Sequence, residues 1–529
     1  MTPPVRTVAQ TAGMIAVITV VARIAGFGRQ VVFARAVGPT CVGSIYQTAN
    51  TLPNILYEIV AGGALASLVV PLLAGAAREG DRVHVDRTTS ALLSWALLVL
   101  MPVAVAIALV ARPLVAVLLA GSRCTGAADL GARLLVVFAP QVILYGVGVV
   151  VAGALQAHER FTGPAVAPLF SSVVVVAAYL AYHASAGAAA AATELGRSAE
   201  LLLSVGTTVG VAALSLPLLL PLRRAGVRVR PTLRFPPGVA LRARRLAAAG
   251  VAVLAAQQLS IAVALRLAND DTPGGTAVVF TLAQAVFLLP WATLAVPLAT
   301  SAFPRLSASA DSDPRRYGQT TAAASRSVLA VTSIAAAALV AAAVPIARVL
   351  VQGVGADADV TTLGRGVAAF APGLLGYGLV ALLSRALYAV HDARAPAVAI
   401  VAGWAVTIAA DVVLSIALPA VDRVVALAVG NSIGMTLAGG LLVAGAARRR
   451  GRECTAGMLR TLVGGVAGGA IGALAGRVVA DAIDGGGAVA AIGEGALAAA
   501  VAVLIAVTVL LSTAGRELRD VARRVVRRA

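Results

Sequence analysis

Three arginines lie inside a stretch that otherwise has the composition of a membrane-spanning helix. The stretch is Thr11-AGMIAVITVVARIAGFGRQVVFARAVG-Pro39, and it contains Arg23, Arg29 and Arg35. A guanidinium group keeps its charge, so placing it at membrane depth costs several kcal/mol, and it normally faces a wet cavity or a partner. The planar guanidinium is also well shaped to bind phosphate. The three arginines therefore predict a membrane cavity that receives an anionic, phosphorylated substrate.

Helix geometry distributes these arginines around the axis. In an ideal helix, Arg23 and Arg29 are about 9 Å apart along the axis and about 120° apart around it. They can line one broad cavity wall at different depths, and structural pairing is the alternative. Arg35 is close to Pro39 and the outer end of the span. It either joins the cavity or extends its side chain to the membrane interface.

The next apolar segment, Ser44-IYQTANTLPNILYEIVAGGALASLVV-Pro71, is unusually polar. Polar residues at spacings of three and four share one helix face. They are Gln47, Asn50, Asn54 and Glu58. A polar face in a membrane span points toward protein or water, so we expect it to line the same cavity, with helix packing as the alternative. Pro53 and the pair Gly62 and Gly63 are expected to bend this helix.

Two further charges fall in apolar segments of the C-terminal half. Arg385 is expected to reach the cavity and contact the substrate. Asp411 is expected either to bind a coupling cation or proton, as carboxylates in transporters do, or to pair with an arginine. No P-loop, GxSxG motif or metal-ligand spacing occurs. We therefore predict a protein without cofactors that is not an enzyme, and any active transport would use an ion gradient, the membrane potential or substrate flux.

Composition sets the class of protein. The 529 residues are 60% hydrophobic and 12% charged, which is too apolar for a soluble globular protein of this length. The net charge of +19 comes mostly from arginines in short loops, where they set membrane topology, so no nucleic-acid partner is predicted. Cys41, Cys124 and Cys454 fall in unrelated places, which indicates neither a metal site nor a disulfide framework.

The apolar segments predict an all-α polytopic membrane protein with about fourteen transmembrane helices. They are centred on residues 8–36, 42–75, 89–119, 131–156, 163–184, 199–221, 240–267, 274–304, 321–351, 364–390, 395–418, 423–446, 457–480 and 489–513. Arginine-rich loops alternate with neutral or acidic ones, and the arginine-rich set is expected to be cytoplasmic. An even number of spans then places both termini in the cytoplasm. The first helix is too long and too polar for a cleavable signal peptide.

An internal repeat divides the chain. Phe138-APQVILYGVGVVVAGALQAHERFTGPAVA resembles Phe370-APGLLGYGLVALLSRALYAVHDARAPAVA without a gap, so that Tyr145 pairs with Tyr377. Six spans in each half give pseudo-symmetric lobes of one orientation, which place a substrate site at their interface. The predicted parts are an N-lobe (1–222), a basic cytoplasmic linker (223–245), a C-lobe (246–446) and a final helix pair with a basic tail (447–529).

Two segments outside the repeat carry patterns of their own. The linker residues Leu222-RRAGVRVRPTLRFPPGVALRARR are expected to anchor the topology, with specific binding of anionic lipid as the alternative. Glycines recur every fourth residue in the thirteenth span, at Gly464, Gly468, Gly472 and Gly476. This pattern favours close helix packing over a lipid-binding groove.

Four segments together resemble a known family. They are Ala22-RIAGFGRQVVFARAVG, Ala49-NTLPNILYEIVAGGALASLVVPLLA, Ala154-LQAHERFTGPAVAPL and Arg385-ALYAVHDARAPAVA. They resemble the MurJ (MviN) lipid II flippases of the multidrug/oligosaccharidyl-lipid/polysaccharide exporter superfamily, in an actinobacterial form. The resemblance implies two lobes and an extra helix pair that forms a groove for a lipid tail. It also implies that lipid II, an undecaprenyl-diphosphate-linked muropeptide, moves from the inner to the outer leaflet for peptidoglycan synthesis, with Arg23 and Arg29 as cavity arginines.

The sequence also departs from the family pattern. Charged residues of many members are replaced here by Ser44, Tyr57, Gly62 and Ala285. Binding of a diphosphate would then rest on Arg23 and Arg29, with Arg385 as a further candidate. Export of another polyprenyl-linked glycan or small molecule, or a non-transporting scaffold role in cell-wall assembly, are the alternatives. The expected location is the cytoplasmic (inner) membrane, with membrane lipids and cell-wall synthesis proteins as partners.

Overall fold

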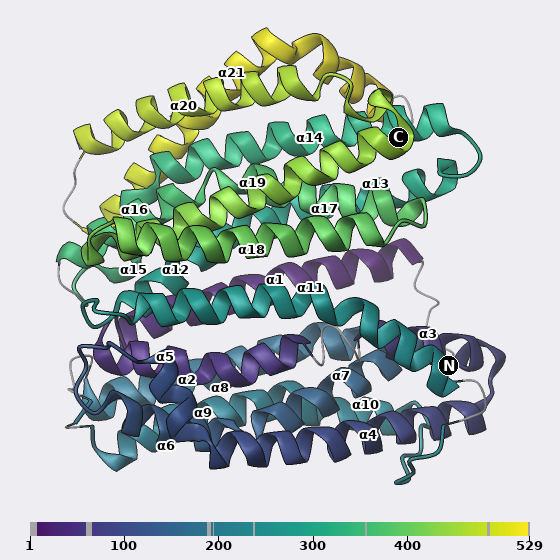
Figure 1. Cartoon of the computed structure of the whole chain (residues 1–529), viewed down its shortest axis with the longest axis vertical. Coiled ribbons are helices and arrows are strands. Elements are labelled where there is room, and N and C mark those ends of the chain that lie inside the picture. The colour runs from purple at the N-terminus through teal and green to yellow at the C-terminus, as the bar shows by residue number, and fades with distance from the viewer. Residues whose placement is uncertain are drawn as a thin grey trace. The chain divides into compact units, whose positions relative to one another are not determined.

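Helices account for all the regular structure in the described part of the chain, and no strand occurs there (Figure 1). The computed structural model describes residues 8–59, 66–187, 192–193, 195–235, 239–354, 357–483 and 487–526. Apolar segments favour helices because a helix satisfies its own backbone hydrogen bonds without water. The chain divides into two compact units, Met1–Ala277 and Val278–Ala529.

The first unit contains eleven α-helices among its described residues. They are α1 (Val8–Ala36), α2 (Cys41–Tyr57), α3 (Ala66–Glu79), α4 (Arg82–Leu109), α5 (Ala111–Leu118), α6 (Ala127–Phe138), α7 (Gln141–Ala157), α8 (Thr162–Ala186), α9 (Arg197–Ser215), α10 (Leu219–Arg224) and α11 (Val239–Ala268). α1 packs on α8, α2 on α6 and α7, and α4 on α7. α11 contacts α2, α3 and α5 and so packs with this unit.

The second unit has ten α-helices in its described residues, the first of which begins just before the unit boundary. They are α12 (Thr276–Pro290), α13 (Val296–Ser309), α14 (Pro314–Ala341), α15 (Ala343–Val351), α16 (Asp357–Phe370), α17 (Gly373–Ala389), α18 (Arg394–Ala417), α19 (Arg423–Arg450), α20 (Met458–Ile483) and α21 (Ala488–Val526). α18 packs on α19, and the pair α20 and α21 packs on α14.

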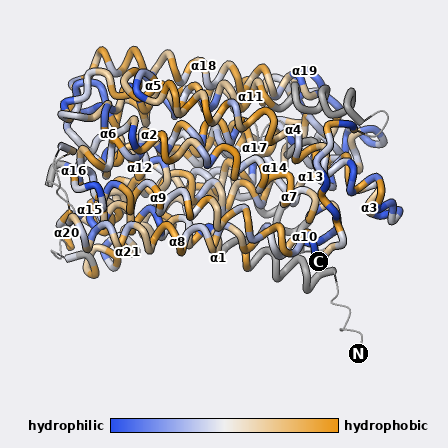
Figure 2. The backbone as a smooth tube through the Cα atoms, turned by 90° about the horizontal axis from the view of Figure 1, so that it is seen from below, coloured by the Kyte–Doolittle hydropathy of each residue, from blue (hydrophilic) through white to orange (hydrophobic). Residues whose placement is uncertain are grey.

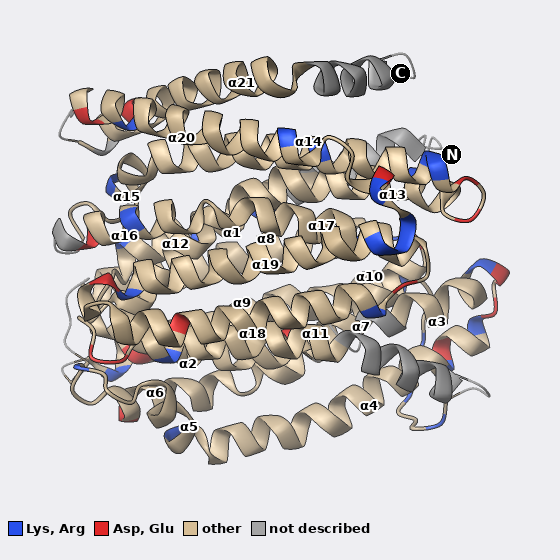
Figure 3. Cartoon of the chain, turned by 45° about the horizontal axis from the view of Figure 1, so that its top comes forward, with Lys and Arg blue, Asp and Glu red and all other residues tan. Residues whose placement is uncertain are grey.

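Many of the described helices have the length and composition of a membrane span. Eleven helices there are long and apolar enough to cross a membrane, or twelve if α16 and α17, bent by 43°, form one span. Apolar residues dominate the middle of the helices (Figure 2), whereas charged residues gather near helix ends and in loops (Figure 3). The two predicted spans outside this set are 8–36, which carries three arginines, and 42–75, which includes the undescribed residues 60–65.

The internal repeat extends to the order and length of the helices. α4, α5, α7 and α8 begin 232 residues before α14, α15, α17 and α18, and the lengths of each pair differ by at most one residue. Phe138 and Phe370, which end α6 and α16, are both fully buried. The lobe boundaries inferred from this repeat stay a prediction. The compact units are defined by packing and not by the repeat, so they do not test these boundaries.

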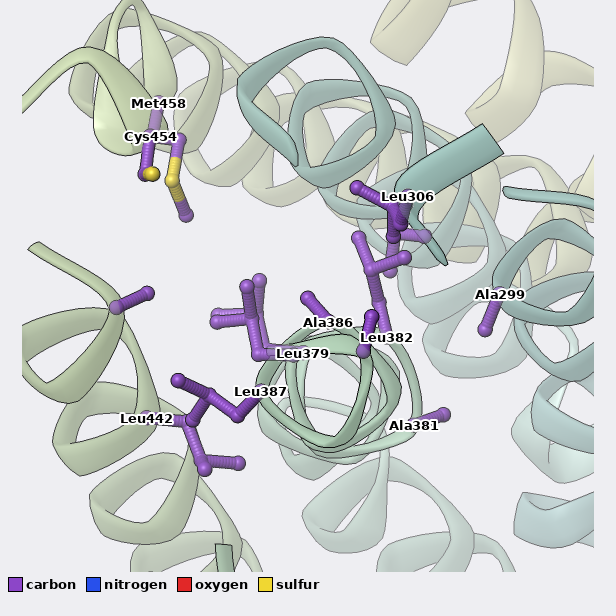
Figure 4. Close-up of a cluster of buried hydrophobic side chains, with 14 of the residues drawn as sticks. Ala299, Leu306, Leu379, Ala381, Leu382, Ala386, Leu387, Leu442, Cys454 and Met458 are labelled. Atoms are coloured by element: carbon purple, nitrogen blue, oxygen red, sulfur yellow. The ribbon is translucent and has the colours of Figure 1, made fainter. Parts of the chain in front are cut away.

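Each unit has its own buried core. In the first, the Tyr46 hydroxyl lies 2.9 Å from that of Tyr179 and 2.7 Å from Thr207 Oγ1, joining α2, α8 and α9. In the second, leucines of α17 pack with Leu306, Leu442 and Met458 (Figure 4). These contacts fix the helices that carry the charged side chains.

The glycine face of α20 packs against α21, as predicted. A Cβ added at Gly472 would lie 2.5 Å from the Ala502 carbonyl oxygen, and one at Gly476 the same distance from that of Ala498. Such close backbone approach is typical of small-residue helix interfaces in membranes.

Candidate functional site

The polar face of α2 meets α7 at Tyr145. The Tyr145 hydroxyl donates a hydrogen bond to Asn54 Oδ1 at 2.8 Å. Its ring lies 4.3 Å, centroid to centroid, from that of Tyr57. Asn54 is therefore fixed by a partner from another helix, and its amide nitrogen keeps its donor capacity. Sequence reasoning used Tyr145 only as a marker of the repeat and missed it as a site residue.

Charges from α1 and α2 surround the same tyrosine. Arg29 is half-buried and close enough to Tyr145 and Tyr179 to interact with both electrostatically. Glu58, exposed at the end of α2, also interacts electrostatically with Tyr145. Three predicted site residues, Arg29, Asn54 and Glu58, thus gather around Tyr145 within the first unit.

Arg23 and Asn50 complete the predicted set in this unit. Arg23 is exposed on α1, and no carboxylate in the described part of the chain forms a salt bridge with Arg23 or Arg29. Asn50 is half-buried, and its Oδ1 has no hydrogen-bond partner among the described residues. The structure thus leaves two guanidinium groups and an amide oxygen of this region available to a ligand. Of the residues expected to bend this helix, Pro53 lies inside α2, and Gly62 and Gly63 lie outside the described residues.

The second unit contains the other two predicted residues, and it places them in different surroundings. Arg385 on α17 is half-buried and donates a hydrogen bond to the Ala381 carbonyl oxygen at 2.6 Å. Asp411 on α18 is 1% exposed and faces Gly430 of α19. Its Oδ1 has no hydrogen-bond partner among the described residues.

The cation role of Asp411 stays a prediction. In the described ranges, no three His, Cys, Asp or Glu side chains gather into a group that could hold a metal ion. A cation bound at Asp411 would therefore take its other ligands from carbonyl, hydroxyl or water oxygens. Such ligands suit hard cations.

The expectation of no disulfide is wrong. Cys41 at the start of α2 and Cys124 between α5 and α6 form a disulfide across 83 residues, with Cα atoms 5.7 Å apart. The sequence carries no sign of this pair because the two cysteines are 83 residues apart and come together only when the chain folds. Cys454 is free and buried.

The segment 269–276 packs over this disulfide. A Cβ added at Gly274 would lie 2.6 Å from Cys41 Sγ, so the backbone passes directly over the bond. Arg123 donates from Nε to Asp271 Oδ1 at 2.9 Å, and this hydrogen bond raises the pKa of Arg123. Gly275 N donates to Ser44 Oγ at 3.1 Å. The start of α2, the α5–α6 loop and the segment after α11 are thus tied together at one end of the first unit.

An apolar groove lies beside α20 in the second unit. It has a volume of about 410 Å³ and lies between α14, the start of α17 and α20. Its lining includes Val340, Leu375, Val466 and Leu474 with Gly465 and Gly469. A groove of this composition suits an acyl or prenyl chain better than a polar ligand.

Comparison with known proteins identifies the family. The model of the family described as lipid II flippase MurJ matches residues 33–480. The chain belongs to the MurJ family of lipid II flippases. The family consists of membrane transporters rather than enzymes.

Individual relatives agree with this assignment. The lipid II flippase MurJ of Burkholderia cenocepacia is 28% identical over 389 residues, which cover 72% of each chain. A probable lipid II flippase MurJ of Synechocystis is 26% identical over 416 residues, covering 74% of this chain and 73% of the relative.

Solved structures show that the fold is that of MurJ. A lipid II flippase MurJ in an inward closed conformation matches with a TM-score of 0.74 at 17% identity, covering 96% of this chain and 99% of that structure. An inward-facing multidrug transporter of the MATE family matches with a TM-score of 0.68 at 13% identity, covering 83% and 99%. The family match begins at Phe33, so the assignment of Arg23 and Arg29 to the MurJ cavity rests on the sequence motif around them.

Proposed function

We propose that this MurJ family member flips lipid II from the inner to the outer leaflet of the cytoplasmic membrane for peptidoglycan synthesis. Family membership across residues 33–480 carries the proposal. The mechanism is alternating access of two six-helix lobes, residues 1–222 and 246–446. Fourteen spans, both termini in the cytoplasm and contact with cell-wall synthesis proteins belong to the same proposal.

The diphosphate of lipid II would bind near Tyr145. Arg23 and Arg29 supply positive charge from α1, and both are without a carboxylate partner among the described residues. Arginine binds phosphate oxygens through two parallel N–H donors. Asn50, Asn54 and Glu58 on α2 would contact the sugar and peptide portion, and Arg385 would contribute from the C-lobe. Substrate binding is supported by the chemistry of these residues and, for Arg29, Asn54 and Glu58, by their clustering around Tyr145.

The polyprenyl tail needs an apolar surface outside the diphosphate site. The groove between α14, α17 and α20 supplies one, since its lining is almost wholly apolar. Burial of hydrocarbon contributes about 0.8 kcal/mol per CH₂ group. The groove therefore supports a long-chain prenyl substrate in preference to a water-soluble drug.

The disulfide supports the proposed orientation. Cys41 and Cys124 lie with Asp270 and Asp271 at the end of the first unit that the positive-inside rule assigns to the outside. Disulfides persist in oxidising compartments and are rare in the cytosol. The charge pattern and the cysteine chemistry thus favour the same orientation.

The test is exposure of lipid II on the outer leaflet in cells depleted of this protein. Wild type is expected to restore exposure and Arg29→Ala is not. Arg316→Ala, which removes an exposed arginine from the start of α14, is the matched control and should restore it. Full rescue by Arg29→Ala would overturn the phosphate site, and unchanged exposure after depletion would overturn the function. Normal growth after joint loss of Arg23 and Arg29 would favour the scaffold role.

A further inference from the structure

The chain between α10 and α11 packs along the first turns of α4. Arg228 N donates to Asp86 Oδ1 at 2.9 Å, Arg230 N to Ser90 Oγ at 3.0 Å, and Thr232 N to Ser94 Oγ at 3.1 Å. We call residues 227–235 the strap. The strap lies within the linker that is expected to anchor the topology, and three of its alternate backbone amides donate hydrogen bonds to α4.

The match of two periodicities explains this packing. Residues 86, 90 and 94 share one face of α4, with about 6 Å of rise between successive members. Two residues of extended chain cover about 6.6 Å. The amides of residues 228, 230 and 232 can therefore each donate a hydrogen bond to a side-chain oxygen on a successive turn of α4. The Trp95 indole Nε1 adds a hydrogen bond to the Leu233 carbonyl oxygen at 3.0 Å.

This packing builds a basic pocket between the strap and α4. The pocket has a volume of about 670 Å³, within the range of ligand-binding cavities. Its positive lining residues are Arg87, Arg228, Arg230 and Arg234. Asp86 is its single acidic lining residue among those described, and it is engaged by Arg228 N. No salt bridge in the described ranges involves any of the four arginines.

The surface beyond the pocket is apolar. Trp95, 41% exposed, marks the change along α4, and Leu98, Met101 and Val105 continue the exposed face at 50%, 53% and 52%. Tryptophan is enriched at the membrane interface. A molecule bound here would place its charged part in the pocket and its hydrocarbon part along α4. A soluble phosphate would use only the pocket.

We propose that the pocket between the strap and α4 binds the phosphate headgroup of an anionic phospholipid of the inner leaflet, whose acyl chains lie along α4. Four guanidinium groups recognise the phosphate, as basic pockets on the cytoplasmic side do for anionic headgroups. The site is separate from the proposed lipid II site and does not depend on transport. A bound lipid would hold the strap, and with it the connection to α11, at the membrane surface.

The test uses quenching of Trp95 fluorescence in the full chain. Trp291→Phe and Trp404→Phe leave Trp95 as the single tryptophan. The protein is reconstituted in phosphatidylcholine vesicles. One series contains increasing amounts of brominated phosphatidylglycerol, and the other contains increasing amounts of brominated phosphatidylcholine. We expect preferential quenching by the brominated phosphatidylglycerol. The triple variant Arg228→Gln, Arg230→Gln, Arg234→Gln should weaken that preference at least about tenfold.

Matched controls separate a site from general attraction. The triple variant Arg305→Gln, Arg316→Gln, Arg448→Gln removes the same charge from exposed positions in the second unit and should keep the preference. Equal quenching by both lipids, or equal loss in both triple variants, would overturn the proposal. Millimolar inorganic phosphate that competes for the pocket as well as phosphatidylglycerol does would also overturn the proposal. The pocket would then be a site for soluble phosphate. Circular dichroism of the strap variant, unchanged from wild type, would exclude unfolding as the cause.

Discussion

The Tyr145 hydroxyl of α7 donates a hydrogen bond to Asn54 Oδ1 of α2 at 2.8 Å. This bond joins a residue of the internal repeat to the polar face that the sequence assigns to substrate binding. Tyr145→Phe removes the donor and keeps the ring in contact with that of Tyr57. We expect about a fivefold loss of lipid II flipping, corresponding to about 1 kcal/mol for one hydrogen bond. Flipping is measured in proteoliposomes.

A control with the same chemical change isolates the role of this hydroxyl. Tyr388→Phe alters an exposed tyrosine of α17 and should leave flipping unchanged. A Tyr145→Phe protein with a lower Tm but normal flipping per folded molecule would show that the bond is structural only.

The disulfide leads to a prediction about thiol counts and stability. Denatured protein that has not been reduced should take one maleimide tag, on Cys454, and reduced protein should take three. Cys41→Ser with Cys124→Ser should lower the free energy of unfolding by about 4.5 kcal/mol, the chain-entropy value for a loop of this length. Thermal unfolding in detergent measures the loss. Three tags without reduction would contradict the pairing.

The close packing of α20 can be tested with the same substitution at two glycines, one packed against a neighbouring helix and one in open space. Gly472→Ala forces a methyl group against the Ala502 carbonyl oxygen, 2.5 Å away, whereas Gly440→Ala in α19 meets nothing within 4 Å. We expect Gly472→Ala to destabilise by about 1–3 kcal/mol through overpacking. Gly440→Ala should be neutral or slightly stabilising, because alanine favours helix. Equal Tm values would show that α20 and α21 separate easily.

The pair Arg348–Glu494 ties α15 to α21 through a nearly buried carboxylate. The Arg348 Nη1 to Glu494 Oε2 distance is 3.1 Å, and the glutamate side chain is 2% exposed. Glu494→Gln removes the negative charge from this pair, and we expect a loss of about 1–3 kcal/mol, because a hydrogen-bonded charge pair with a buried carboxylate is broken. Asp129→Asn, which breaks the exposed pair with Arg112, should cost at most about 1 kcal/mol. Similar Tm changes for both would mean that the buried pair is solvated.

Much of the helix order could be predicted from sequence because the repeat preserves local signals. The backbone at Glu159 and at His391 has φ of 59° and 61°, and these residues are 232 apart. Each follows a helix whose end is closed by the same bond, Arg160 N to Leu155 O and Asp392 N to Leu387 O. Phe, Pro and Tyr positions reveal such a repeat, since they mark helix ends and core sites.

The site and the loops were harder to predict because they depend on contacts between distant segments. Polar spacing on α2 placed Asn54 and Glu58 together, but Tyr145 comes from another helix and carries no local mark of function. The disulfide and the strap have the same character, with partners 83 and about 140 residues apart. Helix pattern alone contains no information on such pairs.

Asp411 gives the last prediction, on energy coupling. Its carboxylate is 1% exposed between α18 and α19, with Oδ1 lacking a hydrogen-bond partner among the described residues. A buried carboxylate of this kind in a transporter is expected to exchange a proton or cation. Asp411→Asn keeps the shape and removes the charge. We expect flipping in proteoliposomes to lose its dependence on an imposed proton or sodium gradient, while the Tm stays near wild type. Asp129→Asn, at an exposed position, should keep the dependence. Gradient-dependent flipping by Asp411→Asn would assign the carboxylate to helix packing, because coupling would then persist without its charge.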